Sequence, residues 1–440
     1  MIKNSFIENS LLPFGDLLLQ TSFIKNLKKC RKQDQLNADQ LGILQKKRLS
    51  EILTFTTQNA EFYKKLEIEI DQANPISSLK KFPVISKREI NEFKDEILTR
   101  PANSLNKISS SGSSGLQSTV YLSKNEISIT RAQQTRWWEW AGYKLGDSIL
   151  QTGISPDRSL VKKVKDYFLK TKYVHAFALL PEEIKLILKE SKKKHVKNFF
   201  GYASSLYVFA EIAAEEGIDI KFESMLCWGD KMFESYRKKI KNVFACDVQE
   251  TYGCTEGFMI ASQHDLKYLY IMTPWVYLEL LDENGQEVKD GEIGQVVVTS
   301  LFAKAFPLIR YKLGDLAIRL PKEKYPKNRK FAYPLLEKVI GRDTDIIKTS
   351  SNKSMIVHSF TGIFEYYPEI RQFQVTQNKL DEIQIKYISN QGKIDRQLNE
   401  IKNKIIQNLK EDITITFKEV SEIPNSPSGK PQIIKSSLKK

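Results

Sequence analysis

Between residues 118 and 300 the chain alternates short apolar runs with amphipathic stretches. This alternation is the sequence feature that most limits which folds the chain can adopt. Residues 148–152 and 221–228 have the composition of strands. Residues 126–140 and 202–216 carry apolar side chains at the spacing of three and four that is typical of helices. Strands that alternate with helices favour an α/β architecture, in which helices pack on the faces of a sheet.

The regions on either side of this alternation predict different structures. Residues 1 to about 105 have a helical pattern and are expected to form a supporting layer. Residues 277–282 and 294–300 are alternating runs separated by the turn at residues 283–285, which predicts a hairpin-rich β region.

The last hundred residues predict a separate α+β unit. Residues 372–377 and 382–388 are expected to be paired strands, residues 394–409 a helix and residues 413–417 a further strand. A chain of 440 residues with 41% hydrophobic side chains is long enough for a large and a small core. We therefore expect a large α/β domain with packed sheets over residues 1–340 and a small, mobile α+β domain over residues 341–440.

Charge and composition set limits on partners. The net charge of +15 would attract polyanions, but the densest basic run, residues 189–197, follows an amphipathic stretch and is interpreted as a solvated helix end. No nucleic-acid-binding motif accompanies the lysines, so a nucleic-acid partner is disfavoured. No run reaches the roughly 18 apolar residues of a membrane span, and the start lacks a secretion signal, so we expect a cytoplasmic protein.

The cysteines and tryptophans have simple interpretations. The four cysteines lack metal-ligand spacing and are expected to be free thiols, and Cys254 is expected to fill space and not to react. The cluster of Trp137, Trp138 and Trp140 could line an apolar pocket for an aryl or fatty acid, but core packing is the commoner role of such a cluster.

A segment rich in glycine and hydroxyl side chains runs from Ser109 to Gly115. Glycine lets the backbone approach a ligand closely, and hydroxyl and amide groups donate to anionic oxygens, so the segment suits a phosphate cradle. It lacks the Gly-Lys-Ser ending of a P-loop NTPase, which argues against that class. By composition alone a flexible linker would look the same, but strand-like runs on both sides predict a loop between two strands.

Three charged residues further along the chain have chemical interpretations. Glu256 follows a predicted strand and could hold Mg²⁺, which bridges phosphate oxygens. Asp315 follows Gly314 and could accept hydrogen bonds from the two hydroxyls of a ribose. Lys430 lies in a turn-rich segment and could stabilise charge at a phosphate. Taken singly, Glu256 would more often be a solvated loop carboxylate, Asp315 would about as often be a turn residue, and one lysine among 68 basic residues would rarely be catalytic.

Taken together and in this order, the segments resemble those of the adenylate-forming superfamily. Residues 252–256 resemble its aromatic-Gly-x-Thr-Glu segment, residues 311–315 its Tyr-x-x-Gly-Asp segment and residues 341–348 its hinge. The resemblance covers nearly the whole chain from about residue 80. Compact length and the segments at residues 307–311 and 372–375 make the phenylacetate–coenzyme A ligase family the most similar, particularly its capsular-polysaccharide-biosynthesis-like branch.

The resemblance implies a set of site residues. It implies catalytic roles for Lys430, Glu256 and Thr255, with Glu256 as the Mg²⁺ ligand and Thr255 at the α-phosphate. Gly229 and Asp230 resemble a Gly-Glu pair that borders the nucleotide and acyl pockets of relatives. The implied ATP-binding residues are Ser110, Ser111, Gly112, Ser113, Ser114, Gly115, Gly229, Asp230, Tyr252, Gly253, Asp315 and Arg342.

The implied reaction is ATP- and Mg²⁺-dependent activation of a carboxylic acid, followed by transfer of the acyl group to coenzyme A, a carrier protein or an amine. Thr344 stands where many relatives have Asp, and Lys348 is followed by Thr349 where many have glycine. These differences leave the acceptor open, as the sequence also leaves the acid and the oligomeric state. Two alternatives remain: an adenylyltransferase that leaves AMP on a phenol-like acceptor, and a nucleotide-binding scaffold or nucleic-acid-binding protein without turnover.

Overall fold

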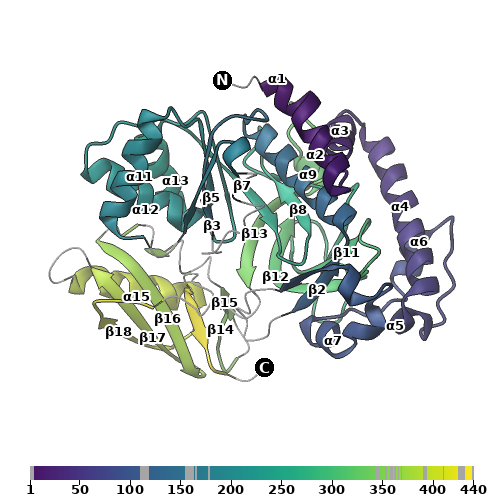
Figure 1. Ribbon diagram of the computed structural model, residues 1–440. Coiled ribbons are helices and arrows are strands. Elements are labelled where there is room, and N and C mark those ends of the chain that lie inside the picture. The colour runs from purple at the N-terminus through teal and green to yellow at the C-terminus, as the bar shows by residue number, and fades with distance from the viewer. Residues whose placement is uncertain are drawn as a thin grey trace.

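The structure is a computed structural model. It describes residues 4–109, 118–153, 163, 166–176, 179–342, 346–351, 354–356, 360, 363–364, 366–367, 369–389, 394–409, 411–424 and 432–438. An eleven-stranded sheet forms its centre, helices cover this sheet, and a second, four-stranded sheet built from the end of the chain lies beside it (Figure 1).

The N-terminal region is helical, as predicted. A capping box starts its longest helix, because Asn37 Oδ1 accepts from the backbone N–H of Gln40 while Gln40 Oε1 accepts from that of Asn37. The elements are α1 (Asn4–Phe6), the π-helical η1 (Ile7–Leu11), α2 (Leu12–Leu19), α3 (Phe23–Gln33), α4 (Ala38–Asn59), α5 (Glu61–Lys64), α6 (Pro75–Leu79), α7 (Lys87–Glu92), α8 (Lys94–Ile97) and η2 (Ala102–Ser104).

One half of the large sheet is parallel. Its strand order is β4-β3-β5-β6-β7, and the predicted strands and helices of this region are confirmed within a few residues. The strands are β3 (Ile149–Gly153), β4 (Thr171–His175), β5 (Asn198–Tyr202), β6 (Ser224–Trp228) and β7 (Val248–Gly253). Helices α11 (Pro181–Lys193), α12 (Ala203–Glu215) and α13 (Glu234–Phe244) pack on this half, while α9 (Lys124–Trp140) contacts α3 and β8.

The other half of the sheet is antiparallel and contains the predicted hairpin region. Its strands, in the order β10-β11-β12-β13-β9-β8-β7, continue the parallel half through β7 and do not form a sheet of their own. They are β8 (Met259–Ser262), β9 (Leu269–Ile271), β10 (Val276–Leu281), β11 (Ile293–Ser300), β12 (Tyr311–Arg319) and β13 (Leu335–Arg342), with the short helix η3 (Lys322–Lys324) between the last two.

Two small hairpins and the C-terminal sheet complete the fold. The hairpins are β1 (Asn106–Ser109) with β2 (Thr119–Leu122), and β14 (Ile346–Lys348) with β15 (Ser354–Ile356). The C-terminal sheet has the order β18-β17-β16-β19, and helix α15 (Asp395–Leu409) packs on it. Its strands are β16 (Ile370–Lys379), β17 (Glu382–Ser389), β18 (Thr414–Glu419) and β19 (Ile434–Ser436). The expected α/β architecture with a smaller C-terminal α+β region is therefore confirmed.

Trp137 and Trp140 belong to the core of the large region and are 2% and 4% exposed. Trp138 is partly buried, and its ring lies 5.1 Å from that of Phe200. Trp140 stacks on Phe331 at 4.6 Å between ring centroids. The two most buried tryptophans of the cluster therefore hold α9 in place.

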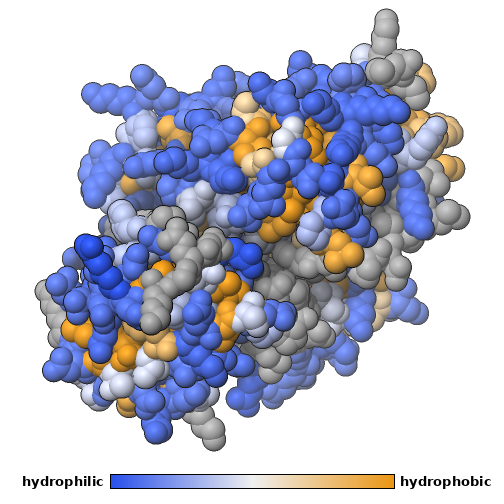
Figure 2. Space-filling view, turned by 90° about the vertical axis from the view of Figure 1, so that its left-hand side faces the viewer, coloured by the Kyte–Doolittle hydropathy of each residue, from blue (hydrophilic) through white to orange (hydrophobic). Residues whose placement is uncertain are grey.

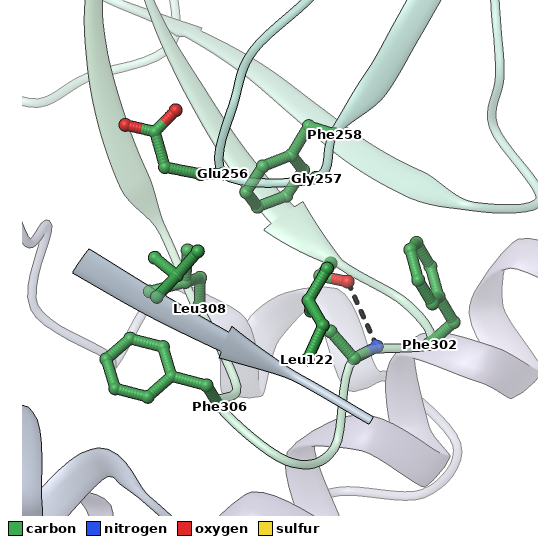
Figure 3. Close-up of a pocket in the computed structure, with 10 residues that line it drawn as sticks. Leu122, Glu256, Gly257, Phe258, Phe302, Phe306 and Leu308 are labelled. Atoms are coloured by element: carbon green, nitrogen blue, oxygen red, sulfur yellow. Dashed lines mark hydrogen bonds between the residues drawn. The ribbon is translucent and has the colours of Figure 1, made fainter. Parts of the chain in front are cut away.

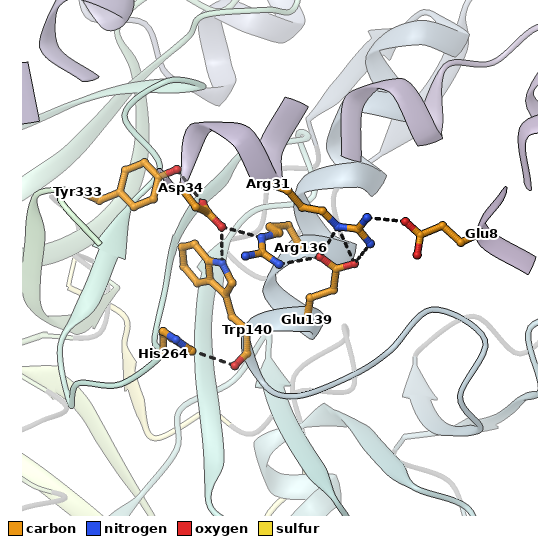
Figure 4. Close-up of polar contacts among 8 residues, drawn as sticks. All are labelled: Glu8, Arg31, Asp34, Arg136, Glu139, Trp140, His264 and Tyr333. Atoms are coloured by element: carbon orange, nitrogen blue, oxygen red, sulfur yellow. Dashed lines mark hydrogen bonds and ion pairs between the residues drawn. The ribbon is translucent and has the colours of Figure 1, made fainter. Parts of the chain in front are cut away.

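A polar network anchors the N-terminal helices to α9 (Figure 4). Asp34 accepts hydrogen bonds from Arg136 Nε at 2.6 Å, Trp140 Nε1 at 2.9 Å and Tyr333 Oη at 2.9 Å. Arg31 bridges Glu8 and Glu139 in the same network. Because Asp34 is buried, these three donors satisfy a carboxylate that would otherwise be costly to bury.

Hydrophilic side chains predominate on the face formed by α11–α13 and the C-terminal sheet (Figure 2). The end of α11, with Lys192, Lys193 and Lys194, is exposed, which confirms the interpretation of this basic run as a solvated helix end. No helix among the described residues has the length and apolar character that crossing a bilayer requires.

Candidate active site

The candidate site lies where the large sheet changes from parallel to antiparallel. Strand β7 pairs with β6 in parallel up to Glu250 and with β8 in antiparallel fashion from Thr251. The junction lies at the carboxyl end of the parallel part of β7, and ligands of open α/β sheets bind outside the carboxyl ends of their strands. The chain leaves β7 at Gly253 and turns through residues 254–258 into β8, which places Glu256 at this junction.

Glu256 is buried and held by two hydroxyl groups from different segments. Its Oε1 accepts hydrogen bonds from Ser118 Oγ at 2.7 Å and from Tyr311 Oη at 3.0 Å. Ser118 directly precedes β2 and follows the glycine- and serine-rich segment, whereas Tyr311 begins β12. Three segments that are far apart in the sequence therefore meet at one carboxylate oxygen.

These contacts keep Glu256 ionised. Burial alone would raise the pKa of the Glu256 carboxyl, but the Ser118 hydroxyl, a backbone hydrogen bond and the charge of Lys87 outweigh it and lower this pKa. The same environment raises the pKa of Tyr311, chiefly through burial and the neighbouring carboxylate. At neutral pH the pair is therefore a carboxylate and a neutral phenol that donates to it.

Tyr252 and Asp315 form the second contact between predicted site segments. Tyr252 Oη donates to Asp315 Oδ2 at 2.9 Å, and both side chains are partly exposed. On the neighbouring strand, Arg342 is the register partner of Asp315, and its side chain lies outside the described part of the structure. The structure thus joins Tyr252 to Asp315 through their side chains and pairs Asp315 with Arg342 through the backbone.

The turn between β7 and β8 is tight. A Cβ on Gly253 would lie 2.5 Å from the carbonyl oxygen of Phe258, which accepts a hydrogen bond from the Cys254 backbone N–H. Gly257 has φ +97°, a conformation that glycine adopts without strain. The turn leaves Thr255 exposed beside the buried Glu256.

Burial raises the pKa of the Cys254 thiol well above its usual value. A protonated thiol is a poor nucleophile, in agreement with the unreactive role expected for this residue.

Asp230 caps a helix. Its carboxylate accepts from the backbone N–H of Ala203 at 2.6 Å and of Ser204 at 3.0 Å, at the start of α12. Gly229 has φ +83°, and a Cβ there would lie 2.3 Å from the ring of Tyr202. The next residue, Lys231, donates to the carbonyl of Ile340 at 3.4 Å, so Gly229 and Asp230 lie close to β13.

Two sets of predicted residues lie outside the described part of the structure. They are Ser110 to Gly115 and Lys430. The strands on either side of the first set, β1 and β2, pair antiparallel from Ser109 with Thr119 to Asn106 with Leu122, which confirms that this segment joins two strands.

A small apolar pocket lies below Glu256 (Figure 3). It holds about 270 Å³ of space between atoms, including open solvent, which is less than most ligand pockets have. The Glu256 carboxylate points away from Leu122, Phe306 and Leu308 in this view. We therefore do not assign an acyl group to this pocket.

The sequence reasoning missed Ser118 and Tyr311 as site residues. Both were inside or next to recognised segments, but nothing in the pattern showed that their hydroxyls would meet at Glu256. Among the described residues, no cluster of three His, Cys, Asp or Glu side chains could hold a metal without help from a ligand.

Comparison with protein-family models identifies the class. Residues 135–302 match the AMP-binding enzyme model, and residues 347–437 match the CapK C-terminal domain model. The chain therefore contains an AMP-binding domain of the adenylate-forming type, followed by a CapK C-terminal domain. Its C-terminal part matches a CapK-type domain, in agreement with the predicted resemblance to the capsular-polysaccharide-biosynthesis-like branch.

Full-length relatives agree with this assignment. Protein CapK of Staphylococcus aureus is 24% identical, and the alignment covers 94% of this chain and 92% of CapK. Phenylacetate-coenzyme A ligase of Thermus thermophilus is 20% identical, with 90% and 96% covered. Among solved structures, 2-hydroxyisobutyryl-CoA ligase in its postadenylation state has a TM-score of 0.74 at 15% identity, with 92% of this chain and 91% of that chain covered.

Proposed function

We propose that this enzyme uses ATP to convert an aryl or fatty carboxylic acid into an acyl-adenylate and then transfers the acyl group to a thiol or amine. The observation that carries this proposal is the meeting of Ser118, Tyr311 and Glu256 beside the Tyr252–Asp315 pair at the parallel-to-antiparallel junction. In this proposal Ser118 follows the phosphate-binding segment, Glu256 is the ionised carboxylate and Asp315 is the carboxylate that binds the ribose.

The donor set of the junction fits Mg²⁺. This ion prefers oxygen ligands and is usually held by one or two carboxylates together with substrate phosphates, not by a full protein cage. Glu256 supplies one carboxylate whose pKa is lowered, although burial opposes ionisation. Glu256 would hold this ion, whose positive charge would offset the negative charge of the phosphates.

In the proposed first step, the substrate carboxylate attacks the α-phosphorus of ATP. A P–O bond to the acyl group forms, and the P–O bond to pyrophosphate breaks. Glu256, held by Ser118 and Tyr311, would hold the metal. Asp315 would bind the ribose, and Thr255 together with residues 110–115 would donate to phosphate oxygens.

We further propose that Lys430 stabilises the charge that develops on the α-phosphate. In this proposal residues 1–340 are the large domain, and residues 341–440 are a mobile small domain that carries the lysine. Rotation at residues 341–345 would remove Lys430 after adenylation and present another face to the acceptor.

Coenzyme A is our preferred acceptor. The relatives that align with most of this chain include a phenylacetate-coenzyme A ligase. One of the similar solved structures is 2-hydroxyisobutyryl-CoA ligase. We place the reaction in the cytoplasm, which supplies ATP and coenzyme A.

Trapping of the activated acid tests the proposal. The protein is incubated with ATP, Mg²⁺ and a panel of aryl and fatty acids, and hydroxylamine converts any acyl-adenylate to a hydroxamate that mass spectrometry detects. We expect a hydroxamate from at least one acid, and a yield at least about 100-fold lower for Glu256→Gln, because a metal contributes several kcal/mol of charge stabilisation.

The matched control is Glu283→Gln, which changes an exposed turn carboxylate and should leave the yield unchanged. A product that retains AMP on a phenol, with no hydroxamate from any acid, would instead identify an adenylyltransferase.

A further inference from the structure

Helix α2 exposes four of its apolar side chains, those of Phe14, Leu17, Leu18 and Leu19. It contains Leu12, Pro13, Phe14, Leu17, Leu18 and Leu19, and none of them is buried. Leu17 is 77%, Leu18 71% and Phe14 63% exposed, and their spacing of three and four places them on one side of the helix. Grouped apolar side chains of this kind, unlike single exposed ones, usually mark an interaction surface.

The part of the helical segment that precedes α2 is attached to the protein. Ile7 is fully buried, and Asn4 Nδ2 donates to Asp147 Oδ1 at 2.8 Å. Glu8 pairs with Arg31 of α3. The segment α1-η1-α2 runs along the outer edge of the molecule, away from the C-terminal sheet (Figure 1). Its exposed side therefore belongs to a docked helix, not to a loose end.

The charges around this helix are positive and unbalanced. The exposed side of the next helix, α3, carries Lys25, Lys28 and Lys32. Two carboxylates near α3 are already used inside the protein, because Glu8 pairs with Arg31 and Asp16 accepts from the backbone N–H groups of Phe23 and Ile24, while a third, Glu51, acts on Lys29. The lysines are thus left to attract an external anion.

We propose that α2 and α3 form a docking surface for an anionic lipid membrane. In this arrangement Phe14, Leu17 and Leu18 enter the boundary between headgroups and acyl chains, and the α3 lysines lie near the lipid phosphates. Apolar side chains beside lysines are the combination by which interfacial helices bind such membranes. The helix lies on the bilayer and does not cross it, since none of the described helices could span one.

Charge argues against a second copy of the chain as the occupant. A symmetric dimer through α2 would bring the same surface of both copies together. The α3 lysines of the two copies would then face each other, and like charges across an interface oppose association. An anionic membrane satisfies both the apolar and the basic part of the surface.

Flotation with phosphatidylcholine vesicles, with and without phosphatidylglycerol, tests the proposal on the full chain. We expect binding only when phosphatidylglycerol is present, and weaker binding at high salt. Leu17→Gln with Leu18→Gln should weaken binding by at least about tenfold for each leucine. Lys25→Gln with Lys28→Gln should weaken it by about fivefold for each lysine.

Matched controls use other exposed residues. Leu180→Gln with Leu186→Gln removes two exposed leucines at α11, and Lys192→Gln with Lys193→Gln removes two exposed lysines from its end. These variants should bind vesicles like the unmodified protein. Thermal unfolding of every variant checks that the fold is kept.

Three results would overturn the proposal. One is the absence of binding to vesicles rich in phosphatidylglycerol. Another is equal loss of binding in the α2 and α11 variants. The last is a dimer in light scattering that Leu17→Gln with Leu18→Gln dissociates while vesicle binding is absent, because a second copy would then be the occupant.

Discussion

Tyr252 donates a hydrogen bond to Asp315 at 2.9 Å, and this bond joins the end of the central strand β7 to strand β12. The contact fixes one carboxylate oxygen of Asp315. If Asp315 binds the ribose, the orientation of its carboxylate is set by Tyr252.

Removal of the Tyr252 hydroxyl is therefore expected to weaken nucleotide binding. Tyr252→Phe should raise the Kd for ATP by about tenfold, since a hydrogen bond to a charged group contributes about 1.5–3 kcal/mol, and Asp315→Ala should raise it further. Isothermal titration calorimetry measures both. Tyr270→Phe is the control, because Tyr270 makes a similar 2.8 Å bond to Asp265 outside the proposed site. An unchanged Kd in Tyr252→Phe would contradict the positioning role.

The Ser118 contact is expected to set the acid limit of activity. A carboxyl whose pKa is lowered in the folded protein stays ionised as the pH falls and is protonated only below the range of an ordinary Glu. Ser118→Ala removes a hydrogen bond that lowers the pKa of Glu256, so this pKa should rise. Both the loss of activity and the loss of the stability that ionised Glu256 contributes should then occur at a higher pH.

The pH profile of pyrophosphate exchange and acid unfolding measure this shift. Ser123→Ala serves as a comparison, because Ser123 caps α9 through Glu126 and does not touch Glu256. Ser123→Ala should lower the free energy of unfolding without changing the pH at which activity is lost on the acid side. The role assigned to Glu256 is wrong if Ser118→Ala loses activity at the same acidic pH as the unmodified protein.

Arg310 is expected to be essential for stability. It makes a paired contact with Glu279, Nη2 to Oε1 at 2.9 Å and Nε to Oε2 at 3.1 Å, and both residues are buried. Arg310→Ala should lower the free energy of unfolding by about 3–5 kcal/mol, because it leaves the Glu279 charge buried and unpaired. Urea unfolding measures the loss.

A surface pair provides the comparison for Arg310. Lys65 and Glu96 are 3.0 Å apart and largely exposed, so Lys65→Ala should cost no more than about 1 kcal/mol. Similar losses for the two variants would show that burial does not decide the contribution of Arg310.

Asp34 is expected to hold the N-terminal helices on α9. Asp34→Ala removes one of the two carboxylate partners of Arg136, which keeps Glu139, and it leaves Trp140 and Tyr333 without their buried acceptor. We expect a loss of about 3–5 kcal/mol in the free energy of unfolding. Hydrogen exchange should show increased opening of α3 in this variant. Asp39→Ala, at the exposed start of α4, should leave exchange in α3 unchanged.

Local patterns in the sequence predicted most of the elements. The run from Glu126 to Trp140 and the paired runs near residues 372–388 have clear periodicity, and each became the expected helix or strand. The change from parallel to antiparallel pairing within β7 could not be predicted. It depends on which distant strands lie on either side, and the residues of β7 itself carry no signal for that.

Only part of the candidate site could be predicted, because the rest depends on which distant segments meet in the fold. Glu256, Tyr252 and Asp315 lie in recognisable segments, but the hydroxyls of Ser118 and Tyr311 gain their role only when three segments meet at Glu256. The anchor between Asp34 and Tyr333 joins residues 299 positions apart, and neither residue stands out in the sequence.

The central claim is that this chain forms acyl-adenylates, and ATP–pyrophosphate exchange tests it most directly. The protein, Lys430→Ala and Glu256→Ala are assayed with labelled pyrophosphate across a panel of aryl, fatty and amino acids. We predict acid-dependent exchange with at least one acid and a loss of about 100- to 1000-fold in each variant. Absence of exchange with every acid, or full exchange in both variants, would contradict the account.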